Sequence, residues 1–103
     1  MYERKQLRKR DYTMRIWGKL WKDNHMIQDT VIELYDINKT RTTKVYESLE
    51  QICDQFDLQK PIWLDVNKQD FIRSARCRFY QDSFIETIPF DYLELHVIEE
   101  DCW

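Results

Sequence analysis

An alternating stretch followed by a turn signal is the feature that most restricts how this chain can fold. From Met14 to Lys22, the sequence MRIWGKLWK places successive side chains on opposite faces, which is the pattern of a β-strand. The dipeptide Asp23-Asn24 is a turn signal, and residues 25–34 form a second segment rich in β-branched side chains. Together the two segments predict a β-hairpin.

The alternation separates the two faces of the first strand but leaves open which of them is buried. Met14, Ile16, Gly18 and Leu20 share one face, and Arg15, Trp17, Lys19 and Trp21 share the other. If helices cover only one side of the sheet, either the tryptophans are partly exposed, or the tryptophan side is the core and the Met14 side is open. In both cases one face has more apolar surface than a monomer needs, so homodimerisation is a reasonable hypothesis.

One apolar stripe predicts the main helix of the chain. Its members recur at helical spacing and are Val45, Leu49, Ile52, Cys53 and Phe56. Thr42 or Thr43 is expected to cap the N-terminus of this helix. The helix is expected to end near Asp57, ahead of Pro61.

A short second helix is predicted over residues 68–73. Asn67 is expected to be its N-cap, with Asp70 at the third helical position. Val66 and Phe71 stand at the two positions of a hydrophobic staple, which would fix the direction in which the chain enters the helix.

Two alternating segments complete the predicted sheet. Residues 76–81 place Cys77 and Phe79 inward and Arg76, Arg78 and Tyr80 outward, and residues 92–99 place Leu93, Leu95 and Val97 on the core face. Asp82-Ser83 is expected to start a turn. Residues 84–89 are expected to be irregular or to form a short strand.

The element order predicts an α+β fold. We expect a four-stranded, mainly antiparallel sheet in ββ-α-α-ββ order, with one main and one short helix on one face. The patterns do not determine the order of the strands in the sheet. If the first and last strands are neighbours, Arg15 and Lys19 could lie opposite Glu94 or Glu99.

Charge is distributed unevenly along a chain whose net charge is −3. Residues 1–22 carry eight basic and two acidic side chains, whereas residues 82–103 carry seven acidic and no basic ones. Either the basic first strand and the acidic last strand pair across the sheet, or they form a dipolar surface that steers a charged partner. Cross-strand pairing is the preferred interpretation because it is common in sheets.

The sequence lacks the signatures of common catalytic and cofactor sites. Its only glycine, Gly18, lies within a predicted strand, which excludes a glycine-rich phosphate loop. The patterns GxSxG, CxxC and HExxH are also absent. We therefore predict no catalytic residues, no metal and no cofactor, and the sequence does not favour an enzyme.

The cysteines indicate the compartment. Three cysteines are an odd number and fit a reducing cytosol better than a disulfide framework. Cys53 and Cys77 are expected to be buried thiols, and Cys102 is expected to be a tail thiol. No window of the sequence approaches the apolar length of a membrane span. A cytoplasmic protein without a membrane partner is therefore expected.

Two surfaces are candidates for binding. The candidate binding surface consists of Trp63, Asp65, Arg73, Arg76, Arg78 and Tyr80. Arginines beside a ring can grip a phosphate or stack on a base, although the acids of the neighbouring strand could instead neutralise them. The candidate interface consists of Trp17, Trp21 and Tyr92, because exposed aromatic rings mark contacts with proteins.

Carboxylates and histidines support weaker hypotheses. The fold could bring Asp65, Asp70 and Asp82 together, but catalysis would require one of them to be buried with a raised pKa. Helix capping and turn formation explain the same residues. His25 and His96 lie on different predicted strands and are a weak sign of a metal site.

Several stretches carry a resemblance. MRIWGKLWKDNHMIQDTVIE, IWLD (62–65), RFYQDSFIE (78–86) and FDYLELHVIEED resemble a group of small uncharacterised proteins from anaerobic Firmicutes with no assigned activity. The likeness runs over residues 14–101 and implies a bacterial, cytosolic protein with a single domain over that range. It also implies that residues 1–13 are a basic N-terminal extension outside the domain. No functional residue is carried over.

The sequence therefore favours a small cytosolic protein-interaction or regulatory module, with homodimerisation through an open sheet face as one form of it. The alternative is nucleic-acid or phospho-ligand binding through the arginine and tyrosine strand face. Nucleic acid is disfavoured because the chain is acidic overall. A small hydrolase is the third hypothesis.

Overall fold

The computed structural model describes residues 14–35 and 38–100, the last two as backbone only. The elements are β1 (Met14–Lys22), β2 (His25–Leu34), α2 (Arg41–Phe56), α3 (Asp65–Ser74), β3 (Arg76–Phe79), the 3₁₀ turn η1 (Gln81–Ser83) and β4 (Tyr92–Glu100). This order confirms the predicted α+β fold. The predicted extension over residues 1–13 and the tail thiol of Cys102 lie outside the described residues.

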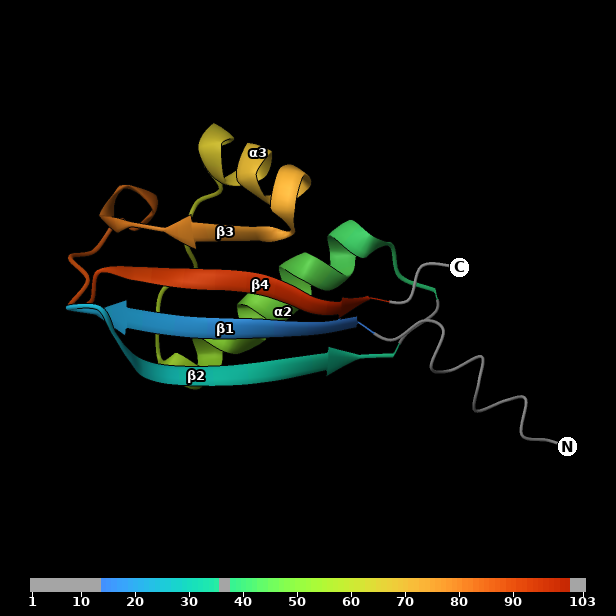
Figure 1. Cartoon of the computed structure of the whole chain (residues 1–103), viewed down its shortest axis with the longest axis horizontal. Helices are drawn as coiled ribbons and strands as arrows, with labels where there is room; N and C mark the ends of the chain where they lie inside the picture. The colour runs from blue at the N-terminus through green and yellow to red at the C-terminus, as the bar shows by residue number, and fades with distance from the viewer. Residues whose placement is uncertain (1–13, 36–37, 101–103) are drawn as a thin grey trace, which may run out of the picture.

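The strands form one antiparallel sheet in the order β2-β1-β4-β3, so that the first and last strands of the chain are central neighbours (Figure 1). In the register of β1 and β4, Lys19 lies opposite Glu94 and Arg15 opposite Glu99. Lys19 and Glu94, one of the charge pairings that the sequence allowed, therefore lie side by side across β1 and β4.

The predicted hairpin is confirmed. Asp23 and Asn24 both have positive φ angles, of 52° and 66°. Two-residue hairpin loops need this conformation because it matches the right-handed twist of the flanking strands. Aspartate and asparagine tolerate it better than most residues, which explains why the sequence turns at this dipeptide.

The face of β1 that carries Met14 is the core face. Met14, Ile16 and Leu20 are buried, and α2 packs against them. A Cβ atom added to Gly18 would lie 2.6 Å from Cγ2 of Ile52 in α2, so only glycine permits this close approach. In Figure 1, α2 passes behind the strands, and the side facing the viewer has no helix among the described residues. The tryptophans of β1 therefore lie on the uncovered side.

The N-terminus of α2 differs from the prediction. Thr40 is the N-cap, with extended backbone angles, and its Oγ1 accepts a hydrogen bond from the backbone N–H of Thr43 at 3.1 Å. The prediction of Thr42 or Thr43 as the cap is wrong, because both already lie in the first helical turn. The C-terminus is as predicted, since Asp57 adopts the left-handed conformation that ends a helix.

The second helix starts earlier than predicted, so its predicted N-terminal residues have other roles. Asn67 is the third helical position rather than the N-cap, and its Oδ1 accepts a hydrogen bond from the N–H of the N-cap residue Leu64 at 2.9 Å. Val66 lies inside the first turn and is 57% exposed, so the predicted staple is wrong. The Nδ2 of Asn67 donates to the carbonyl of Arg78 at 2.8 Å, which ties α3 to the outer edge of the sheet.

The segment between β3 and β4 is irregular. This is one of the two forms that the sequence predicted for residues 84–89. Strand β3 ends at Phe79, two residues before the predicted end, and η1 follows at the predicted turn. Phe84 and Phe90 anchor the irregular segment in the core through an edge-on ring contact at 5.8 Å. No helix of the described residues is long and apolar enough to cross a membrane.

Candidate functional site

The uncovered side of the sheet, named here the open face, brings charged and aromatic residues of all four strands together. It is formed by Arg15, Trp17, Lys19 and Trp21 of β1, by Asp29, Val31 and Glu33 of β2, by Tyr92, Glu94 and His96 of β4, and by Arg76 and Arg78 of β3 with the following Tyr80. These residues share a face because they pair in register and alternate with the core residues.

A buried ion pair lies at the centre of the open face. Nζ of Lys19 is 3.6 Å from Oε1 of Glu94, and the two side chains are only 9% and 4% exposed. The indole N–H of Trp21 donates a hydrogen bond to the same oxygen at 3.0 Å. Burying two charges is unfavourable unless they are paired and hydrogen-bonded; here the two charges are paired, and Trp21 supplies a hydrogen bond to Glu94.

Two arginines of β3 approach the same carboxylate from the other side. Arg76 and Arg78 each place a guanidinium nitrogen 3.9 Å from Oε2 of Glu94, with side chains 48% and 49% exposed. This distance is a charge contact rather than a hydrogen bond. The predicted neutralisation by the acidic strand is thus observed in part, since three cations including Lys19 share one carboxylate and leave a formal surplus of two positive charges.

Aromatic rings lie over and between these charges. Trp21 stacks on Tyr92 with 6.3 Å between ring centroids, and Tyr80 lies 5.2 Å from Tyr92. Nζ of Lys19 lies 3.8 Å from the centroid of the Trp17 ring, and Cζ of Arg78 lies 4.8 Å from that of Tyr92. Such cation–ring contacts stabilise both the charge and the orientation of the ring.

His96 lies on the open face among its charged residues. The pKa of His96 is lowered, first by burial and then by the charges of Arg76 and Lys19, with Glu94 opposing them. Its Nδ1 is buried and has no hydrogen-bond partner among the described residues. Burial is therefore the main cause of the lowered pKa, and the two cations add to it.

The open face is bordered by a hollow of about 440 Å³, named here the sheet-side hollow. Its lining consists of Val66, Asp70 and Ser74 from α3 and of Arg76, Cys77, Arg78 and Tyr80 from β3 and its end. Spacings of four residues place the three α3 residues on one side of that helix. The arginine row of the open face is therefore one wall of a concave site.

Parts of the two predicted surfaces lie on the same face of the structure. Arg76, Arg78 and Tyr80 of the candidate binding surface lie on the same face as Trp17, Trp21 and Tyr92 of the candidate interface. The remaining candidates lie elsewhere. Asp65 is exposed in the first turn of α3, and Arg73 pairs with Asp70 on the same helix at 2.6 Å. Whether either surface binds a partner stays a prediction.

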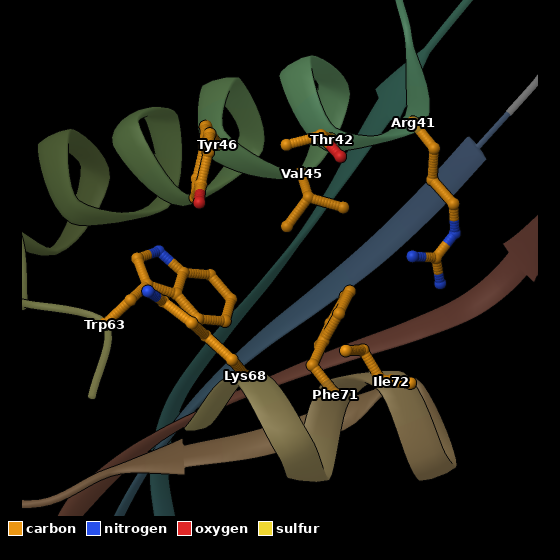
Figure 2. Close-up of a pocket in the computed structure, with 8 residues that line it drawn as sticks. All are labelled: Arg41, Thr42, Val45, Tyr46, Trp63, Lys68, Phe71 and Ile72. Carbon is orange, nitrogen blue, oxygen red and sulfur yellow. The ribbon is translucent and has the colours of Figure 1, made fainter. Parts of the chain in front are cut away.

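Trp63 belongs to the opposite side of the molecule, where a second hollow of about 220 Å³ separates α2 from α3. Figure 2 shows its lining: Arg41, Thr42, Val45, Tyr46, Trp63, Lys68, Phe71 and Ile72. We name it the helix-side hollow. Trp63 makes edge-on contacts to Tyr46 and Phe71, both at 5.7 Å, and to Phe79 at 5.0 Å. Its first role is to pack the two helices onto the sheet.

The buried thiols and the candidate carboxylates do not form a reactive centre in the described structure. Burial raises the pKa of Cys53 to about 11 and that of Cys77 to about 12, so both thiols stay protonated and are poor nucleophiles at neutral pH. Asp65 and Asp82 are exposed, which does not give the burial that general acid catalysis needs. No group of three or more metal-ligating side chains occurs within the part of the chain that the structure describes.

Glu94 is the functional candidate that the sequence did not single out as a centre. The only signal was the charge pattern of the first and last strands, which made an opposition of Lys19 and Glu94 one option.

Comparisons with models of protein families, with curated proteins and with solved structures found no match. The resemblance to the group of small proteins therefore stays a prediction.

Proposed function

We propose that this protein is a protein-binding module that recognises its partner through the open face. The observation that carries the proposal is the buried pair of Lys19 and Glu94 on a sheet face without a covering helix among the described residues. The rings of Trp21 and Tyr92 and the arginines of β3 surround this pair. Tryptophan, tyrosine and arginine are the residues enriched at the energetic centres of protein interfaces.

The arrangement also supports a rigid recognition surface. Contacts to Glu94 fix Lys19 and Trp21, and contacts to Tyr92 fix Tyr80 and Arg78. Side chains that are already ordered lose little entropy when a partner binds. A face of freely moving lysines and glutamates would lack this advantage.

A protein partner is favoured over a nucleic acid. Binding of single strands relies on bases that stack on open aromatic faces. One face of the Trp17 ring is already occupied by Lys19, and one face of the Tyr92 ring by Arg78. The net charge of the chain is −3, whereas nucleic-acid binding proteins carry a broad basic surface.

A partner other than a second copy is favoured by charge. In a two-fold symmetric dimer the same patch meets itself, so contact through the centre of the open face would bring two clusters with surplus positive charge together. A partner with an acidic surface would instead be complementary. Homodimerisation, which the sequence suggested, is therefore an outcome to be tested. A cytoplasmic location accords with the two buried free thiols.

Site-specific photo-crosslinking in cells tests the proposal. A photoreactive phenylalanine analogue would replace Tyr80 on the open face, and in a matched control it would replace Ile72, which is 84% exposed on α3. We expect one discrete adduct with another protein from position 80, lost when Arg76 and Arg78 are changed to glutamate, and none from position 72. Adducts only with the chain itself would support the homodimer instead. Equal adducts from both positions, or none, would contradict the proposal.

A further inference from the structure

We infer that the sheet-side hollow holds a phosphomonoester group of the protein partner, bound by Arg76 and Arg78. This inference rests on the proposed function, since it names the chemical group that the open face recognises. The hollow adjoins the open face, because Arg76, Arg78 and Tyr80 belong to both. A partner lying on the open face could therefore place a side chain in the hollow.

The two arginines are positioned to bind an oxyanion. About half of each side chain is exposed, and each guanidinium lies 3.9 Å from Oε2 of Glu94. At that distance Glu94 holds the guanidinium groups in place without accepting a hydrogen bond from them. Planar guanidinium groups bind phosphate oxygens in pairs, and two of them on one strand present neighbouring donors on the same face.

The local charge matches a dianion better than a monoanion. Lys19, Arg76 and Arg78 surround the single carboxylate of Glu94, which leaves a formal surplus of two positive charges. A phosphomonoester carries about −1.5 to −2 charges at pH 7, whereas a carboxylate or a phosphodiester carries about one negative charge. The cluster therefore complements a phosphorylated side chain most closely.

The other wall of the hollow does not cancel this charge. Its one acidic residue, Asp70, is paired with Arg73 at 2.6 Å. Tyr80 and Val66 offer exposed apolar surface at the rim, which can contact the group that carries the phosphate. Burial is the main cause of the lowered pKa of His96, and Arg76 and Lys19 add to the lowering although Glu94 opposes it.

Titration of the full chain with small probes, followed by NMR, tests the inference. O-phospho-L-tyrosine is the phosphomonoester probe, dimethyl phosphate is the phosphodiester probe and benzoate is the carboxylate probe. We expect phosphotyrosine to shift the side-chain resonances of Arg76 and Arg78 and to raise the pKa of His96, since an anion nearby favours the protonated imidazole. In His96→Gln, where no imidazole gains charge as the pH falls, binding should weaken from pH 7.5 to pH 5, because the phosphate loses its second charge.

Matched variants separate the hollow from general charge attraction. Arg76→Gln and Arg78→Gln should each weaken phosphotyrosine binding at least about tenfold, the effect of losing a charged hydrogen bond. Lys68→Gln removes the same charge from the neighbouring helix, where Lys68 is exposed and lines the helix-side hollow instead, and should change the affinity less than about twofold, as expected for an exposed charge. The spectra of the variants show whether each remains folded.

Three results would overturn the inference: no shift of the Arg76 and Arg78 resonances, equal affinity for benzoate, or an equal loss of affinity in Lys68→Gln. If no probe binds but position 80 still gives a specific adduct, the phosphomonoester inference is wrong and the proposed function stands. Tighter binding of a single-stranded oligonucleotide than of phosphotyrosine would instead identify a nucleic-acid surface and contradict both proposals.

Discussion

The open face and the helix-side hollow contain the same kinds of residue but use them differently. In the hollow between α2 and α3, the rings of Trp63 and Phe71 contact each other, and Cζ of Arg41 lies 5.2 Å from the centroid of the Phe71 ring (Figure 2). On the open face, a ring also donates a hydrogen bond to a buried carboxylate, from Trp21 to Glu94, and Lys19 of the same ion pair contacts Trp17.

The difference shows how the neighbours of an aromatic residue decide its role, since Trp63 and Trp21 are both half-buried. Trp63 packs against Phe79, which is fully buried, so its contacts hold the helices on the sheet. Trp21 lies on a face that the described elements leave uncovered, and its polar N–H is used to anchor a charge. We therefore expect substitutions on the helix side to change stability first, and substitutions on the open face to change binding first.

The largest effect is expected for Trp63→Ala. Removing a large ring that contacts Tyr46, Phe71 and Phe79 should lower the free energy of unfolding by about 3–5 kcal/mol. Trp21→Ala loses one hydrogen bond and the stacking contact with Tyr92, and should lower it by about 1–2 kcal/mol while abolishing the adduct from position 80. Urea denaturation of both variants measures the contrast. A smaller loss for Trp63→Ala than for Trp21→Ala would reverse the assignment of the two sides.

The next effect concerns the buried pair of Lys19 and Glu94. Glu94→Gln leaves a largely buried ammonium group without its carboxylate, and should lower the free energy of unfolding by about 3 kcal/mol, the lower limit for breaking a buried pair. The double variant Lys19→Met with Glu94→Gln should lose less, because no uncompensated charge remains. A double-mutant cycle measures the coupling. Additive losses would show that the two side chains do not interact.

The smallest effect is the pH dependence that His96 adds. Its folded-state pKa is lowered, so the unfolded chain binds this proton first as the pH falls. The stabilising contribution of neutral His96 is therefore complete above the unfolded pKa of about 6.5 and is lost as the pH falls through it towards the folded pKa. Between pH 7.5 and pH 5, the wild type should lose more stability than His96→Gln. Parallel losses in urea titrations would show that the folded-state pKa of His96 is not lowered.

Local patterns in the sequence were enough to predict the fold class. Strands alternate with a period of two and the helical stripe with a period near 3.6, so β1, β2, α2 and β4 were predicted close to their observed bounds. Helix starts were harder to predict, since threonines and an asparagine offered several caps. Thr40 is the N-cap because its backbone is extended, whereas Thr43 is already helical.

The composition of the candidate site could be predicted only in pieces. Arg78 and Trp21 lie far apart in the sequence, and no local pattern showed that both would lie close to Glu94. The hydrogen bond from Trp21 to Glu94 joins residues 73 positions apart, and it depends on the strand order β2-β1-β4-β3. That order follows from packing of the whole sheet. The sequence therefore indicated which residues carry chemistry, and only the topology placed them on one face.

The photo-crosslinking yield from position 80 relative to position 72 tests the central claim, recognition of a protein partner through the open face, most directly. Both positions are exposed, one beside the arginines of β3 and the other on α3. The account predicts a discrete heterologous adduct from position 80 alone, lost when Arg76 and Arg78 are changed to glutamate. A heterologous adduct from position 72 alone would place recognition at the helix-side hollow and contradict the account.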